Sequence, residues 1–209
     1  MMTPRRASHS GTGQPLLTKA GYHHGNLRTA LIESAVALVR AHGAHGFTLA
    51  EASRAAGVTA AAPYRHFDSR EELLACVAER GFELLRATMS GVPVGGWSDP
   101  LDRVIALGVR YVEFAVSEPQ LFKLMFSLEY RLPAAQAGRE ALGLLEQALH
   151  EAERAGRLST DLGTAMKAAW ALAHGVATLR IDGMATFRSD DSAAIAATLR
   201  ALLSGVAQP

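Results

Sequence analysis

Apolar residues recur every three or four positions along most of the chain, a spacing that places them on one face of an α-helix. The first such segment runs from residue 26 to about residue 42 and carries Leu27, Leu31, Ala35, Leu38 and Val39. Asn26 is a suitable N-cap before it, and glycines at positions 43 and 46 predict its end. No convincing run of alternating β-branched residues competes with this pattern, so we predict an all-α fold.

A second pattern, from Thr48 to Phe67, reads TLAEASRAAGVTAAAPYRHF and predicts two short helices joined by a tight turn. Thr48 and Glu51 have the spacing of a capping box, in which each residue satisfies an N–H group of the other. Gly57 suits a left-handed turn. We expect Thr59 to cap the next helix, which runs to about residue 66 with a proline in its first turn. Two helices at this spacing form the minimal unit that places one helix in the major groove of DNA.

The pattern continues with Ser69 and Glu72, a second capping box that opens a long helix ending near Ser90. Residues 91–100 break every periodicity and predict a domain boundary. Beyond it we expect further helices at roughly 101–117, 119–128, 134–155, 161–187 and 190–204. The predicted organisation is a disordered basic tail over 1–24, a helix-turn-helix domain over 25–85 and a helical regulatory and dimerisation domain over 86–209.

Composition narrows the class of protein. The 209 residues are 49% hydrophobic and 20% charged, as in globular proteins. No apolar stretch reaches the roughly 18–20 residues needed to cross a bilayer, and the N-terminus lacks the apolar core of a secretory signal. Cys76 is the only cysteine, which excludes an intrachain disulfide. We therefore expect a cytoplasmic protein without a membrane partner.

The net charge of +1 hides an uneven distribution of charge along the chain. Residues 1–70 contain eight Lys/Arg and three Asp/Glu, a net charge of +5, while the remaining residues carry a net charge of −4. A basic segment joined to an acidic one predicts a polyanionic partner for the basic segment alone. A basic tail does not explain the excess, because five of the eight basic residues lie beyond Gly25, in the predicted helices.

The segment from Asn26 to Leu85 resembles the N-terminal domain of TetR-family transcriptional regulators. The similarity rests on the first-helix core and on Gly46-Phe47-Thr48, Ala55-Ala56-Gly57-Val58-Thr59, Tyr64-Arg65-His66-Phe67 and Ser69-Arg70-Glu71-Glu72-Leu73. The resemblance implies a three-helix DNA-binding domain joined to an all-α domain for ligand binding and dimerisation, with small molecules releasing the DNA. Later in the chain, Trp170 and His174-Gly175 resemble the Trp-His-Gly pattern of one class of TetR C-terminal domains.

The predicted DNA contacts gather around the second short helix and are Thr48, Thr59, Ala60, Ala61, Tyr64, Arg65, His66 and Arg70. The small residues allow close approach to base edges, and Arg65 alone can make a bidentate contact to guanine. Tyr64 and His66 resemble the phosphate-contacting pair of the family, and Arg70 stands where the family usually has lysine. Thr48 offers a hydroxyl and helix N–H groups to a phosphate.

These assignments have structural alternatives. Tyr64 and Phe67 could be core aromatics, and Arg65 could be a solvated charge. Pro63 replaces the leucine that is commoner in the family, and the alanines before it offer few groups that read bases. Specificity would then depend partly on DNA shape.

Bulky residues of the C-terminal half are candidates for an apolar ligand pocket, namely Phe114, Phe122, Met125, Phe126, Trp170 and His174. An ordinary core explains the same residues, and Trp170 and His174 share a helix face that could instead lie at a dimer interface. Alanines over 165–177 and 193–201 permit the close helix packing of such an interface. A dimer is expected because one short helix reads too few base pairs.

Together these features predict a sequence-specific DNA-binding transcriptional regulator, acting as a ligand-released homodimeric repressor on double-stranded operator DNA. The predicted effector is a small apolar molecule. The sequence has no phosphate-binding loop, nucleophile motif or metal quartet, so we expect no enzymatic activity, no cofactor and no metal. The alternative is a helical ligand-binding or adaptor protein without specific DNA binding, against which the basic first 70 residues argue.

Overall fold

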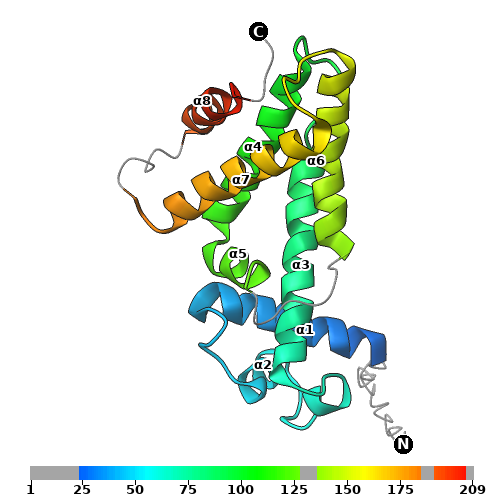
Figure 1. Cartoon of the computed structure of the whole chain (residues 1–209). Helices are drawn as coiled ribbons and strands as arrows, with labels where there is room; N and C mark the ends of the chain where they lie inside the picture. The colour runs from blue at the N-terminus through cyan, green and yellow to red at the C-terminus, as the bar shows by residue number, and fades with distance from the viewer. Residues whose placement is uncertain (1–23, 128–135, 185–190, 206–209) are drawn as a thin grey trace, which may run out of the picture.

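The computed structural model describes residues 24–127, 136–184 and 191–205, and the regular structure in these ranges is helical (Figure 1). The N-terminal part contains α1 (His24–His42), α2 (Leu49–Ala55), the 3-10 turn η1 (Pro63–Arg65) and the start of α3 (Arg70–Ser90). The later helices are α4 (Pro100–Ser117), α5 (Pro119–Met125), α6 (Gln136–Arg154), α7 (Leu162–Ile181) and α8 (Ser192–Leu203). The predicted all-α fold is confirmed. The predicted tail over 1–24 lies, apart from its last residue, outside the described residues.

Helix α3 is the axis of the molecule. In Figure 1 it runs from α1 and α2 at one end to α4 and α6 at the other. It contacts α1, α4, α5 and α6, and it buries Leu73 and Val77 in its first half and Leu85 and Met89 in its second. One hydrophobic core therefore continues from the N-terminal helices into the C-terminal bundle.

Aspartate caps set the starts of the later helices. The carboxylate of Asp99 accepts the N–H of Leu101 at 2.9 Å before α4, and that of Asp161 accepts the N–H of Thr164 at 3.0 Å before α7. Each bond satisfies an N–H group that the helix itself leaves unpaired. Asp99 also pairs with Arg157 at 3.0 Å, and this ion pair ties the start of α4 to the connection between α6 and α7.

Two predicted boundaries differ from the structure. Helix α1 begins at His24, two residues before the predicted Asn26 cap, a shift usual at frayed helix ends. Helix α7 ends at Ile181 and not near residue 187, because Gly183 has φ +73, which a right-handed helix does not contain. Residues 185–187 lie outside the described part. The predicted break over 91–100 coincides with the connection from α3 to α4.

Within the described ranges, no helix combines the length and the apolar character required to cross a bilayer.

Candidate DNA-reading unit and ligand cavity

The start of α2 is the capping box that the sequence predicts. The Thr48 hydroxyl accepts the N–H of Glu51 at 3.3 Å, and Oε2 of Glu51 accepts the N–H of Thr48 at 2.8 Å. The pKa of the Glu51 carboxyl lies below its ordinary value, mainly because the backbone N–H of Thr48 donates to it and secondly because the Thr48 hydroxyl does. Because the N–H groups of Thr48 and Glu51 are engaged in the capping box, the first turn of α2 leaves those of Leu49 and Ala50 to meet an anion.

Gly57 turns the chain after α2. Its φ of +71 lies in the left-handed region that favours glycine. The N–H of Gly57 donates to the carbonyl of Arg54 at 3.1 Å, and the N–H of Val58 donates to that of Ser53 at 3.0 Å. These two bonds define a Schellman ending, and Val58 packs half-buried against the core.

The predicted helix over 59–66 does not form as a continuous α-helix. The N–H of Ala62 donates to the carbonyl of Thr59 at 3.0 Å, and the N–H of His66 donates to that of Pro63 at 2.8 Å, so both bonds span three residues. Pro63 has no N–H for an α-helical bond to Thr59, and its ring would meet that carbonyl. Proline therefore opens a 3-10 turn of its own instead of extending a helix that Thr59 starts.

The predicted reading surface is nevertheless solvent-facing. Tyr64 is 65% exposed, so it is not a core aromatic. The exposed set also includes Thr48, Thr59, Ala60, Ala61 and Arg65, whereas His66 is half-buried. Phe67 is 1% exposed, which confirms the alternative interpretation of this residue as a core aromatic. The contacts of the exposed residues with DNA stay predictions.

Two arginines hold this unit together. Arg70, a predicted phosphate contact, is half-buried, and its guanidinium donates to the carbonyls of Phe47, at 3.1 Å, and Ala44. It also lies over the Phe47 ring, 5.2 Å from the centroid. The observed role of Arg70 is therefore to tie the start of α3 to the loop before α2. Arg28 of α1, which the sequence pattern does not single out, lies 5.1 Å from the centroid of the Phe67 ring.

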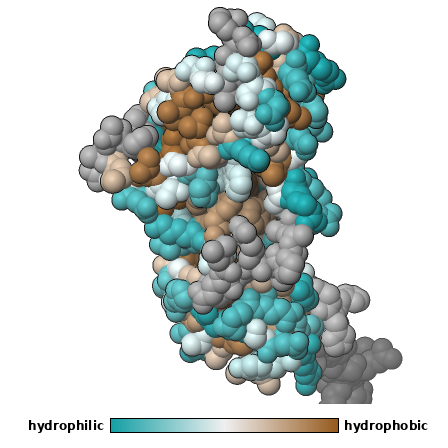
Figure 2. All heavy atoms as spheres, in the orientation of Figure 1, coloured by the Kyte–Doolittle hydropathy of each residue, from teal (hydrophilic) through white to brown (hydrophobic). Residues whose placement is uncertain are grey.

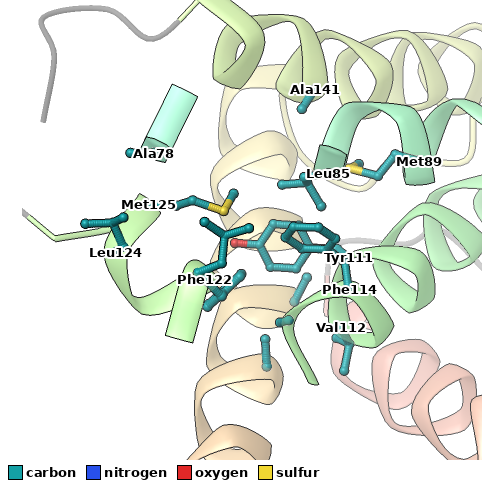
Figure 3. Close-up of a cluster of buried hydrophobic side chains, with 14 of the residues drawn as sticks. Ala78, Leu85, Met89, Tyr111, Val112, Phe114, Phe122, Leu124, Met125 and Ala141 are labelled. Atoms are coloured by element: carbon teal, nitrogen blue, oxygen red, sulfur yellow. The ribbon is translucent and has the colours of Figure 1, made fainter. Parts of the chain in front are cut away.

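A cavity of about 310 Å³ lies among α3, α4, α6, α7, α8 and the end of α5. Its wall is mostly apolar, and Figure 3 shows Leu85, Met89 and Tyr111 among the buried side chains of this region. The volume falls at the lower end of small-molecule sites, which span roughly 300–1,000 Å³. Arg139, an exposed residue of α6, is the only formally charged side chain in the described lining.

The lining only partly matches the predicted pocket. Met125, Phe126 and Trp170 contribute to it, but Phe114, Phe122 and His174 do not. Phe114 is a buried core residue of α4. Phe122 and His174 lie behind the wall, with their rings 5.5 Å apart in a stacked arrangement. The lining residues that the sequence pattern misses include Phe82, Leu85, Met89, Tyr111 and Leu145.

Tyr111 pairs with His174 beside the cavity wall. Its hydroxyl forms a hydrogen bond of 2.8 Å with Nδ1 of His174, and the tautomer of His174 sets which of the two donates. The rings of Trp170 and His174, one helical turn apart on α7, have centroids 6.4 Å apart. Burial raises the pKa of Tyr111 above its ordinary value, and burial lowers the pKa of His174. At neutral pH this pair therefore consists of a neutral phenol on the wall and a neutral imidazole behind it.

The cavity and the reading unit are joined by two helices. Helix α3 carries Arg70 at one end and the lining residue Met89 at the other. Helix α5 ends at the lining residue Met125, and its N-cap Glu118 accepts both Nε of Arg40, at 2.8 Å, and Nη2, at 2.6 Å. Arg40 is in the last turn of α1, so this ion pair links the cavity-bearing α5 to the DNA-reading unit.

One face of α7 is not available to a partner. Ala165, Ala169, Ala173 and Ala177 are buried within the protomer, because α7 packs against α4 on this face. The opposite positions of α7, including Ala171, are exposed, as are Ala193, Ala197 and Ala201 of α8. Figure 2 shows apolar residues gathered over the end of the molecule that carries α8, whereas the end with α1 and α2 is largely hydrophilic.

In the described part of the chain, no three His, Cys, Asp or Glu side chains come together as a metal site requires.

Two sequence families match the chain. The family described as bacterial regulatory proteins, tetR family, matches residues 31–77. The family described as tetracyclin repressor-like, C-terminal domain, matches residues 104–206. No curated protein matches the chain.

Solved structures match the whole architecture. A protein of unknown function from Rhodococcus sp. RHA1 is 30% identical, with 91% of this chain and 100% of that chain covered and a TM-score of 0.74. The regulator FadR from Bacillus subtilis, in complex with stearoyl-CoA, is 17% identical, with 85% and 98% covered and a TM-score of 0.67. RolR in complex with resorcinol is 21% identical, with 88% of each chain covered and a TM-score of 0.64. At 17% and 21% identity the similarity concerns the fold alone.

Proposed function

The chain belongs to the TetR family of DNA-binding transcriptional regulators, and from this premise we propose that it is a homodimeric repressor that a small apolar effector releases from its operator. The family regulates transcription by binding DNA and is not enzymatic, which agrees with the expectation from the sequence. The repressor role, the dimer, the domain boundaries over 25–85 and 86–209, and the effector are parts of the proposal.

The observation that carries the proposal is that α3 connects the reading unit to the cavity without interruption. Arg70 binds the loop before α2 at one end of the helix, and Phe82, Leu85 and Met89 line the cavity toward the other. A helix is a stiff element, so a displacement at the cavity end moves the turn that presents Tyr64. The position of the reading segment is then sensitive to what fills the cavity.

Release follows from a population shift. The effector binds better to a conformation in which the two reading segments of a dimer no longer match successive major grooves, which lie roughly 34–36 Å apart. An effector that prefers this conformation 100-fold supplies about 2.7 kcal/mol of coupling. Two proteins of this fold, FadR with stearoyl-CoA and RolR with resorcinol, bind small molecules. The apolar cavity supports the same kind of control here.

The proposed dimer uses the outward faces of α7 and α8. Exposed small residues at Ala171, Ala197 and Ala201 permit close helix approach, and Trp170 and Leu202 are large apolar side chains left 41% and 45% exposed. This revises the sequence-based interface over 165–177, because Ala165, Ala169, Ala173 and Ala177 face the protomer core. A two-fold dimer would place two reading segments on one face of DNA.

The decisive experiment is selection of DNA sites from a random duplex library, followed by fluorescence anisotropy on the selected site. We expect salt-dependent, sequence-specific binding. Arg65→Ala should weaken discrimination between bases at one position, while Arg154→Ala, an exposed arginine on α6, serves as the matched control. Equal affinity for selected and random duplexes would support the alternative, a ligand-binding or adaptor protein without specific DNA binding.

A further inference from the structure

The chemistry of the cavity wall narrows the class of effector, an inference that rests on the proposed function. Among the described lining residues, Arg139 alone carries a formal charge, and it is exposed at the first turns of α6. Arg103 is a buried cation that precedes the lining residue Val104 in the sequence. It is outside the lining, and its Nη1 donates to Glu151 at 2.8 Å. The interior thus presents no charge to a ligand.

The wall offers few polar atoms to a ligand. The Tyr111 hydroxyl is engaged in a hydrogen bond of 2.8 Å with Nδ1 of His174. The indole of Trp170, which is 41% exposed, adds a single N–H donor. A ligand that offered several hydrogen-bonding groups would lose its bonds to water and find few partners inside.

The remaining wall consists of alkyl and aromatic groups from several helices, including Phe82, Leu85, Ile105, Met125 and Leu145. A volume of about 310 Å³ equals that of about ten water molecules in the liquid, each taking about 30 Å³. Attraction in such a space grows with the buried hydrocarbon area and ends when the space is full.

We propose that the cavity binds an uncharged, hydrocarbon-rich molecule of about ten non-hydrogen atoms, and that the hydrogen-bonded Tyr111 and His174 form a closed polar seam that supports the wall without anchoring the ligand. Ionic amphiphiles of the same length are excluded, because the interior cannot solvate their charged groups.

The test uses the full chain and isothermal titration calorimetry with 1-hexanol, 1-octanol and 1-decanol, against octanoate and octylammonium. We expect affinity for the alcohols to rise about fourfold per methylene, from about 0.8 kcal/mol each, and to level off near ten non-hydrogen atoms. The two octyl ions should bind more than 100-fold more weakly than 1-octanol. Binding of octanoate or octylammonium as tight as that of 1-octanol, or no binding of any alcohol, overturns the proposal.

Three variants locate the site. Leu142→Trp fills the cavity from its wall and should reduce 1-octanol affinity more than tenfold, whereas Leu144→Trp, on the same helix outside the lining, should not. Tyr111→Phe should change 1-octanol affinity less than threefold. A loss above tenfold in Tyr111→Phe would identify the hydroxyl as an anchor and overturn the proposed seam. Circular dichroism confirms that each variant folds.

The effect of 1-octanol on DNA affinity separates the two proposals. Binding of the alcohols with unchanged DNA affinity contradicts the proposed release mechanism but supports this ligand class. Release of DNA by octanoate alone supports the mechanism and contradicts the ligand class.

Discussion

The close crossing of α3 and α5 makes a quantitative prediction at Gly81. This glycine is buried in the middle of α3, and a Cβ placed on it would lie 2.7 Å from Cγ and Sδ of Met125 and 3.3 Å from Cδ1 of Leu121. Replacing a helical glycine with alanine normally stabilises a helix by about 0.8–1.0 kcal/mol. Forcing one extra carbon into a packed core costs about 1–3 kcal/mol. We therefore expect Gly81→Ala to change the unfolding free energy by between about zero and a 2 kcal/mol loss.

Gly143 provides the matched control. It lies in α6, and a Cβ at that position would meet no other atom within 4 Å. Gly143→Ala should therefore show the helix gain alone, about 0.8–1.0 kcal/mol. The two substitutions change the backbone in the same way, so the difference between them, about 1–3 kcal/mol, measures the steric contact with Met125.

Urea unfolding followed by circular dichroism measures all the required variants. In a Met125→Ala background the two closest contacts are gone and only Leu121 Cδ1 at 3.3 Å remains, so Gly81→Ala should now stabilise the protein by up to about 1 kcal/mol. If Gly81→Ala alone raised the unfolding free energy as much as Gly143→Ala does, the close crossing of α3 and α5 would be refuted. If the changes in unfolding free energy caused by Gly81→Ala and Met125→Ala simply add in the double variant, Met125 is not the obstructing side chain.

Four further predictions address the DNA surface, the interface, the buried histidine and the ion pair. Tyr64→Ala should lower DNA affinity in a gel-shift assay without changing the urea midpoint; unchanged affinity would remove it from the DNA contacts. Ala171→Arg should give folded monomers in sedimentation, whereas Ala173→Arg, in the core, should unfold the chain. Burial lowers the pKa of His174, so as the pH falls the unfolded chain takes up a proton on this residue before the folded chain does. The unfolding free energy should therefore fall as the pH drops below 6.5, and it should fall less steeply in His174→Gln than in the unmodified protein. Glu118→Gln should cost at most about 1 kcal/mol of stability in urea, since the ion pair is near the surface.

Local chemistry made the N-terminal unit predictable from the sequence. The capping box of Thr48 and Glu51 and the left-handed turn at Gly57 depend on residues at most a few positions apart, and both form as expected. Pro63 is the instructive exception. Proline is tolerated in the first turn of a helix, which predicts one helix from Thr59 to residue 66. In the structure the missing N–H and the ring of Pro63 divide this segment and leave only a 3-10 turn.

The cavity was less predictable because its wall comes from side chains far apart in sequence. Phe114 and Phe126 have the same chemistry, yet one is a core residue and the other lines the cavity, a difference set by how the helices cross. Glycines inside helices are the sequence signal that indicates where two helices cross closely. Gly81, Gly108 and Gly138 each lie where a Cβ would come within 3.4 Å of a side chain on another helix, which marks close crossings.

The two connections between cavity and reading unit are separable by mutation. Glu118 holds α5 to α1 through Arg40, and Met125, at the other end of α5, both lines the cavity and packs against Gly81 of α3. A ligand that displaces Met125 therefore acts on α3 directly and on α1 through α5, which packs against α1 and is joined to it by the Glu118 ion pair. If α3 alone transmits the displacement, Glu118→Gln leaves the ratio of DNA affinities with and without ligand unchanged, while Gly81→Ala alters it. If α5 contributes, Glu118→Gln reduces that ratio although ligand affinity is retained, because its substitution lies outside the cavity wall.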